Sequence, residues 1–334
     1  MSERIQLAHG GGGTLMQQLI ERELKPLYND PAEVLHDAAS FTVPAGQLAF
    51  STDGYVVQPL EFPGGDIGSL AITGTANDLA MAGARPLRLS VGLILEEGLE
   101  LELLRRLVAS MRVAAERCGV QVITGDTKVV ERGKADQVFI TTSGIGVVEA
   151  ATDPHPTAIR PGDQLLVSGD LGRHGVAILA ARHGLALQPP VLSDCAPLWP
   201  LVELLLAAGV QPHCLRDLTR GGLASALQEL ASAVGVVMCL EEERLPVIAP
   251  VRRTCDLLGF DPLHLANEGR LLAVVAREQL DAALAVLEPR GGAWIGEVLE
   301  GSTALTTARV RLRTAFGTER LLLPISGELL PRIC

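Results

Sequence analysis

The chain has 334 residues, of which 48% are hydrophobic and only 3% aromatic, and its formal net charge is −11. This length predicts two domains, with cores built from Leu, Val, Ile and Ala. The negative charge argues against a general nucleic-acid surface, but it is compatible with a nucleotide that Mg²⁺ bridges to carboxylates.

Membrane and secretion signals are not evident in the sequence. No apolar run reaches the roughly 18 to 20 residues of a membrane span, and no apolar segment follows Met1–Arg4 as in a signal peptide. The six cysteines include no CxxC pair, which argues against a zinc knuckle or a redox motif. We therefore expect a cytoplasmic protein that binds neither membrane nor nucleic acid.

Strand and helix patterns alternate in the first half of the chain. A Gly-rich loop precedes a predicted helix over 14–24, and an apolar segment predicts a helix over 68–81. The clearest amphipathic pattern covers 99–118, where Leu103, Leu104 and Leu107 share one face and Gly119 ends the helix. Predicted strands cover 48–51, 87–95, 120–124 and 137–148.

A segment rich in Pro, Gly and Asp between 152 and 162 indicates a domain boundary. Beyond it, helices are predicted over 175–182, 198–208, 222–234, 251–258 and 278–287, and strands over 164–168, 236–240 and 271–275, with two short strands after residue 287. The alternation predicts an α+β (mixed α/β) fold in two domains. We expect a lead-in over 1–35, domains over 36–152 and 158–316, and a mobile tail over 317–334.

The sequence contains neither a Walker-type loop nor a GxGxxG motif, so phosphate binding would need another structure. One candidate is the loop His9-Gly10-Gly11-Gly12-Gly13, which is followed by a helix start at Thr14. Backbone N–H groups of consecutive glycines can converge on an anion, and the helix dipole favours negative charge there. The same loop could equally be a flexible linker, so both interpretations stay open.

Aspartates in Gly-rich segments form the second candidate site. Asp53 and Asp126 are each predicted to lie just past a strand, and Asp37 follows a helix-like segment. Hard oxygen ligands in such places suit Mg²⁺ bound to phosphates, although a single Asp often just stabilises a turn. Asp78 lies inside an apolar helix, where an unpaired carboxylate is costly, which favours a functional role. Lys128 is either a surface residue or, beside Asp126, a group that neutralises a transferring phosphoryl group.

Two further motifs lie in the second domain. Asp217-Leu218-Thr219-Arg220-Gly221-Gly222 places a carboxylate, a cation and two glycines at a predicted helix start. Asn267-Glu268-Gly269 leads into an apolar strand. This Asn-Glu pair can be an ordinary turn, but if it faces the site, Glu268 is a candidate general base.

The chain ends on Cys334, preceded by Pro331-Arg332-Ile333. Chain ends are commonly frayed, so the tail alone does not show that this cysteine is functional. A thiol on the last residue can nevertheless travel between its own active site and that of a partner.

These motifs, in this order, resemble the aminoimidazole ribonucleotide synthetase superfamily, and within it the hydrogenase maturation factors that act as carbamoyl dehydratases. The Pro-Arg-Ile-Cys ending separates that branch from purine-synthesis and selenophosphate relatives. The other motifs that carry the resemblance are 8–13, 51–54, 62–68, 74–80, 124–130, 217–222 and 266–269.

The resemblance implies a homodimer whose N-terminal domains (36–152) pair into a β-barrel, with ATP and Mg²⁺ between the domains. It implies that a carbamoyltransferase, HypF, loads Cys334 with a carbamoyl group, which ATP then dehydrates to a thiocyanate. The cyano group passes to iron on a HypC–HypD scaffold, for a nickel–iron hydrogenase. It implies catalytic roles for Cys334, Glu268 and Lys128, metal binding by Asp37, Asp53, Asp78 and Asp126, and cofactor binding by His9, Gly10, Gly11, Asp53, Asn77, Asp78, Thr127, Lys128, Asp217 and Asn267.

Two other functions compete with this one. A superfamily enzyme of purine or selenophosphate type would act on a free small molecule, and its ATP turnover would not depend on Cys334. Against the selenophosphate version, the N-terminal Gly loop holds no Cys or Lys. A non-catalytic adaptor with a docking tail would tolerate replacement of Asp53 and Asp78.

Overall fold

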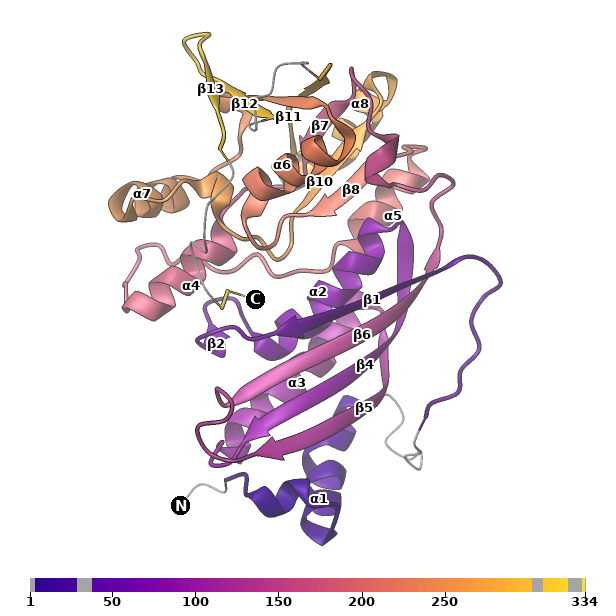
Figure 1. The fold of residues 1–334 in the computed structure, drawn as a ribbon, viewed down its shortest axis with the longest axis vertical. Coiled ribbons are helices and arrows are strands. Elements are labelled where there is room, and N and C mark those ends of the chain that lie inside the picture. Colours follow the sequence, from indigo (N-terminus) through magenta and orange to yellow (C-terminus); the bar gives the residue numbers. More distant parts are fainter. Residues whose placement is uncertain (1–3, 29–37, 302–308, 324–331, 334) are drawn as a thin grey trace.

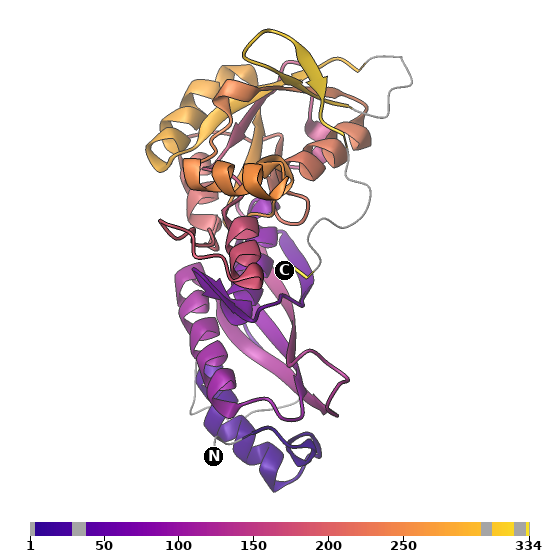
Figure 2. The ribbon, with the colours of Figure 1, turned by 90° about the vertical axis from the view of Figure 1, so that its left-hand side faces the viewer.

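The computed structural model describes residues 4–28, 38–301, 309–323 and 332–333. Two sheets, one above the other, form the two bodies of an elongated molecule (Figures 1 and 2). Among the described residues, none of the helices combines the length and the apolar character needed to cross a membrane. The predicted positions of Asp37 and Cys334 lie outside the described residues.

The N-terminal body is a four-stranded sheet in the order β1-β6-β4-β5, covered on one face by two helices. In Figure 1 these helices lie behind the sheet, whose other face is open. A small hairpin precedes the first of these two helices. The elements are β1 (Leu48–Tyr55), β2 (Glu61–Phe62), β3 (Gly65–Asp66), α2 (Ile67–Met81), β4 (Ala84–Glu96), α3 (Leu101–Cys118), β5 (Gln121–Val130) and β6 (Val138–Val148).

The two helices are buried to different degrees. Helix α3 buries one stripe against α2 and the sheet, and Gly119 ends it in the left-handed conformation (φ 67°), as the sequence predicted. Helix α2 is buried nearly all round because it lies between the sheet and the second body. Asp66 caps α2 by accepting from the Ser69 N–H at 2.8 Å. Gly74 is required in α2 because a Cβ there would lie 2.3 Å from the Tyr55 hydroxyl.

The lead-in packs on β5 and α3 at the far end of the N-terminal body. The helix predicted over 14–24 is α-helical only at its start and then widens into a π-helix. Its elements are η1 (Leu7–Gly10), α1 (Thr14–Leu19), the π-helix η2 (Ile20–Leu24) and η3 (Lys25–Leu27).

The C-terminal body is a seven-stranded sheet in the order β13-β12-β9-β11-β7-β10-β8. In the described part of the chain, three strands, rather than the predicted two, follow α8. The strands are β7 (Gln164–Val167), β8 (Cys214–Asp217), β9 (Val237–Glu241), β10 (Leu271–Val275), β11 (Ala293–Leu299), β12 (Val310–Arg313) and β13 (Glu319–Leu321). The helices are η4 (Pro156–Ala158), α4 (Arg173–His183), α5 (Trp199–Ala207), α6 (Gly222–Val234), η5 (Glu242–Arg244), α7 (Ala249–Leu258), η6 (Pro262–His264), η7 (Arg277–Gln279), α8 (Leu280–Leu287) and η8 (Glu288–Arg290).

Helices cover both faces of this sheet, which explains why its central strands are apolar throughout. In β10, Leu272 and Val274 pack with α6, whereas Leu271, Ala273 and Val275 pack with α5 and α8. The remaining pair, α4 and α7, packs together beside η6. The mixed α/β, two-domain fold expected from the sequence is confirmed.

Candidate active site

The candidate site is centred on Glu268, between the two bodies. Glu268 follows η6 and precedes β10, its side chain is almost completely buried, and its Oε1 atom has no hydrogen-bond partner. Burial, reinforced by the charge of nearby Asp194, raises the pKa of the Glu268 carboxyl well above its ordinary value. A buried carboxyl of this kind binds a proton strongly, as a general base must.

The main chain of Glu268 is held from two sides. Its N–H donates to Asp194 Oδ1 at 3.2 Å, and its carbonyl accepts from Asn77 Nδ2 at 3.3 Å. Asp194 belongs to the loop between α4 and α5, and Asn77 belongs to α2 of the other body. The position of Glu268 therefore depends on both domains.

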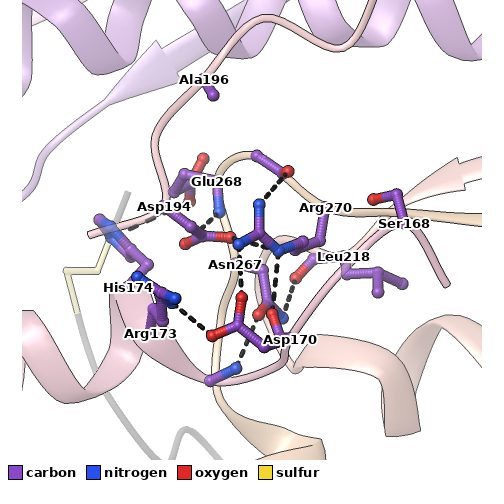
Figure 3. Close-up of polar contacts among 12 residues, drawn as sticks. Ser168, Asp170, Arg173, His174, Asp194, Ala196, Leu218, Asn267, Glu268 and Arg270 are labelled. Carbon is purple, nitrogen blue, oxygen red and sulfur yellow. Dashed lines mark hydrogen bonds and ion pairs between the residues drawn. The ribbon is translucent and has the colours of Figure 1, made fainter. Parts of the chain in front are cut away.

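Next to Asp194 lies a network of charges around Arg270 (Figure 3). Arg270 pairs with Asp170 at 2.6 Å, donates to the Gly269 carbonyl at 2.9 Å, and lies 3.9 Å from Asp194 Oδ2. Arg173, at the start of α4, also binds Asp170. This network fixes the bend that carries Glu268.

His174 connects Glu268 with the end of the chain. Its Nε2 atom lies 4.0 Å from Glu268 Oε1 and donates to the Ile333 carbonyl at 2.8 Å. A carbonyl can only accept, so the proton is on Nε2, and Nδ1 accepts from Ser193 Oγ at 2.9 Å. Burial lowers the pKa of His174, which keeps the ring neutral. The residue that directly precedes Cys334 is thus bound beside the buried carboxyl.

The last described residues lie between α4 and β2, as the short yellow segment in Figure 1 shows. Ile333 is buried, and the Arg332 carbonyl accepts from the Gln58 N–H at 3.2 Å and from Arg182. The Arg332 side chain pairs with Asp136.

Three predicted aspartates come together at a second place in the contact between the two bodies. Asp53 and Asp78 lie on the adjacent elements β1 and α2, and Asp217 ends β8. Burial, with a contribution from Asp78, raises the pKa of Asp217 to about 7, and burial also raises the pKa of Asp78, which accepts from Ser51 at 2.7 Å. Asp53 lies within β1 rather than past its end, because β1 continues to Tyr55.

The remaining predicted residues lie elsewhere in the chain. Asp126 and Lys128 are within β5, not in a turn, and they form an exposed ion pair at 2.6 Å. In the register β1-β6-β4-β5, they lie at the opposite edge and on the opposite face from Asp53. The Gly loop lies beside them, since a Cβ on Gly10 would be 3.0 Å from Val129. His9 lies in this loop, and Thr127 is buried on the helix-covered face of β5. One chain therefore holds two separate groups of predicted residues.

Both predicted asparagines make three hydrogen bonds to main-chain groups. Asn77 donates to the Ala196 and Glu268 carbonyls and accepts from the Leu198 N–H at 2.8 Å. Asn267 accepts from the Gly172 N–H at 2.7 Å and donates to the Leu218 and Leu265 carbonyls. In this structure they join main-chain segments, and both amide N–H groups of each side chain are used by protein carbonyls.

Replacing Asn77 by Ala is expected to lower the free energy of unfolding by about 1–3 kcal/mol, because three buried main-chain groups lose their partner. Denaturant unfolding measures this change. Exposed Gln211 serves as the control, since Gln211→Ala should change stability by at most about 0.5 kcal/mol. Equal stability of the two variants would contradict a linking role for Asn77.

Four residues that contact Glu268 or the end of the chain were not predicted from the sequence: His174, Arg182, Asp194 and Asp136. His174 is the second residue of α4 and Arg182 lies near its end, in what reads as an ordinary helix region, and nothing local marks them. Their common signal is long-range, because all four contact Glu268 or the last residues of the chain.

Comparison with known proteins places the chain in a family. The N-terminal and C-terminal domain models of the AIR synthase related proteins match residues 35–148 and 160–306. Carbamoyl dehydratase HypE of Rhodobacter capsulatus is 49% identical, over 99% of this chain and 98% of that protein. A solved hydrogenase maturation protein HypE in complex with ATP has a TM-score of 0.92 and 46% identity, covering 98% of this chain and 99% of that one. A HypE from a HypE–HypF complex has a TM-score of 0.78 and 43% identity, covering 82% and 89%.

The chain therefore belongs to the AIR synthase-related family of two-domain α/β proteins. Within that family it belongs to the HypE carbamoyl dehydratases of hydrogenase maturation. The resemblance predicted from the motifs, and the class of enzyme, are confirmed.

Proposed function

We propose that this chain uses ATP to dehydrate a carbamoyl group, carried as a thiocarboxamide on Cys334, to a thiocyanate. The product supplies the cyanide ligand of iron in nickel–iron hydrogenase. The observation that carries this proposal is the hydrogen bond from His174 Nε2 to the Ile333 carbonyl. The same Nε2 atom lies 4.0 Å from Glu268 Oε1, which has no hydrogen-bond partner. It holds the residue before the carrier cysteine at a buried proton acceptor.

The chemistry needs an activated oxygen and an acceptor for protons. The carbamoyl oxygen takes the terminal phosphoryl group of ATP, and the nitrogen gives up one N–H proton, for which Glu268 is the acceptor. The C–O bond then breaks, phosphate departs with that oxygen and takes up the second N–H proton, and the nitrile forms. Water must be kept out because the activated group would hydrolyse, and the buried site with its docked chain end supports this.

ATP and Mg²⁺ fit the cluster of Asp53, Asp78 and Asp217. The raised pKa values of Asp78 and Asp217 reflect negative charge gathered in a partly dehydrated place, which a divalent cation would relieve. Within the described ranges, no three His, Cys, Asp or Glu side chains suffice to hold a metal ion. Mg²⁺ on a nucleotide usually takes one or two carboxylates, with phosphates and water completing its shell, so two of these aspartates are enough. The solved relative in complex with ATP supports nucleotide binding.

A homodimer would make neighbours of the two edge strands that carry the separated groups of residues. The edge strands β1 and β5 have no outer neighbour among the described residues, and Leu48 and Phe50 on β1 are 48% and 69% exposed. Pairing β1 of one copy with β5 of the other closes the two sheets into a barrel. It places the strand that carries Asp126 and Lys128 of one copy beside the strand that carries Asp53 of the other, with these side chains on opposite faces of the joined sheet. The family resemblance implies that Lys128 neutralises the transferring phosphoryl group.

The partners follow from the same chemistry. A HypE relative has been solved in a HypE–HypF complex, which supports HypF as the carbamoyltransferase that loads Cys334. The HypC–HypD scaffold is the proposed acceptor of the cyano group. The proposed domain roles are ATP binding and dimerisation for 36–152, and the docking of the tail by 158–316.

The test of this proposal is the variant His174→Leu, which removes the donor to the Ile333 carbonyl. We expect dehydration of a pre-loaded chain to slow about tenfold to a hundredfold in single turnover, because the carrier is no longer held near Glu268. His174→Gln keeps a donor at the Nε2 position and should recover most of the rate. Equal rates for the Leu variant and the unchanged chain would contradict the proposal.

A further inference from the structure

The end of the chain is held by side chains from both bodies. Arg332 pairs through its guanidinium with Asp136, on the connection between β5 and β6, and donates from Nε to the Val56 carbonyl at 3.2 Å. Its own carbonyl accepts from Arg182, on α4, which also binds the Gln58 carbonyl at 2.7 Å. Asp136 therefore contacts the Arg332 side chain, and Arg182 contacts its main chain.

This arrangement is imposed on the tail. Arg332 has a φ of 56°, a left-handed conformation that a residue with a Cβ rarely adopts unless its surroundings require it. Asp136 is also positioned, because Glu96 accepts from the Gln137 and Gly133 N–H groups and fixes the connection that carries it. Two positioned groups thus hold a residue in a conformation that it would leave when released.

The tail has two opposing tasks in the proposed function. It must lie beside Glu268 while its carbamoyl group is dehydrated, and it must leave when a separate enzyme loads Cys334. We propose that Asp136 and Arg182 are positioning residues that recognise Arg332 and set the relative populations of the docked and the released tail. This inference rests on the proposed carrier role of Cys334. Stronger binding of Arg332 favours dehydration, and weaker binding favours loading of Cys334.

The Asp136–Arg332 pair is well suited to such a balance. The two side chains are 34% and 40% exposed, so water weakens their attraction, and the pair stabilises the docked tail only moderately. The tail can therefore still be released. A buried ion pair at this position would hold the tail beside Glu268 and block loading.

The test compares two rates in the full-length chain with Asp136→Asn. The first is loading of Cys334 by the HypF carbamoyltransferase with carbamoyl phosphate and ATP, and the second is single-turnover dehydration of the pre-loaded chain. We expect loading to become about threefold faster and dehydration about threefold slower. The control is Glu149→Gln, which removes a similarly exposed ion pair with Arg85 in the same body and should change neither rate.

A charge exchange excludes a general structural effect. Asp136→Arg alone should slow dehydration about tenfold by repelling Arg332, and combining it with Arg332→Asp should restore most of the rate. Alkylation of Cys334 by iodoacetamide, followed by mass mapping, reports release without any partner: it should be faster in Asp136→Arg and return toward the original value in the double variant.

The outcomes separate the two claims. Opposite changes of loading and dehydration, with rescue by the exchanged pair, support the positioning role. Unchanged rates in Asp136→Asn, or a double variant no better than Asp136→Arg, overturn it while Cys334 still becomes loaded and dehydrated. If Cys334 is never loaded in the unchanged chain, the proposed function itself fails.

Discussion

Glu268→Gln is expected to slow dehydration by about a thousandfold and to leave loading of Cys334 unchanged. The reason is that Gln keeps the size of the side chain but cannot accept a proton from the carbamoyl nitrogen. The Glu268 oxygen nearest to His174 has no hydrogen-bond partner, so it is available to substrate. The chain should therefore accumulate in its carbamoylated form, which intact mass distinguishes from the dehydrated form.

The pH dependence of the dehydration rate is a second test of Glu268. Only the carboxylate accepts a proton, so dehydration should become faster as the pH rises through the raised pKa of Glu268. The Gln variant should show no such rise. A full-rate Gln variant, or one that keeps the pH dependence of the unchanged chain, would contradict the role of Glu268 as base.

Stability should change in the opposite direction from activity. Because the folded pKa of Glu268 lies above its ordinary value of 4.5, the folded chain binds the proton more tightly than the unfolded chain. Its contribution to the free energy of unfolding is then lost as the pH rises above that ordinary value. Gln does not titrate, so Glu268→Gln should be at least as stable as the unchanged chain at neutral pH, and the difference should grow with pH. A large loss of stability would instead point to a structural role.

Asp78→Asn is expected to lower ATP-dependent dehydration by about 100-fold. Asp78 lies in the acidic cluster, where the charge of Asp53 acts on it, and the amide loses the negative charge that would hold Mg²⁺ and its phosphates. The loss should appear as weaker Mg²⁺-dependent binding of ATP, measured by calorimetry. The variant should fold, because burial already disfavours the charged form of Asp78.

The control for this prediction is Asp153→Asn. Asp153 is an exposed aspartate in the connection between the two bodies, away from the cluster. It should bind ATP and turn over as the unchanged chain does. If Asp78→Asn behaves like this control, the acidic cluster is not the nucleotide site, and a non-catalytic adaptor with a docking tail becomes the better interpretation.

The fold was predictable where local pattern decides it. Helix α3 shows a clear apolar stripe and a terminal glycine, and both appear in the structure. The strands β1 and β5 extend beyond their predicted ends because pairing with β6 and β4 continues through Asp53 and Lys128, and no local propensity signals that pairing. The same sheet register separates Asp126 and Lys128 from Asp53, which motif spacing alone cannot reveal.

The site was predictable in its acids but not in its supports. Asp78 stood out because an unpaired carboxylate inside an apolar helix is costly without a function, whereas Asp53, Asp217 and Glu268 were singled out by their motifs and by the family resemblance. His174 and Asp136 carry no such mark, because their role comes from residues 159 and 196 positions away in the chain. The assignment of Asn77 and Asn267 as nucleotide ligands stays a prediction, and in this structure their amides link main-chain segments.

The central claim is that Cys334 carries the group that is dehydrated, and intact mass tests it most directly. The full-length chain is incubated with HypF, carbamoyl phosphate and ATP, with Cys334→Ala as the control. The account predicts a gain of one carbamoyl group on Cys334, followed by an ATP-dependent loss of one water, and no change in the control. If no mass appears on Cys334 while HypF is active, the carrier role is wrong, and an enzyme that acts on a free small molecule becomes the better account.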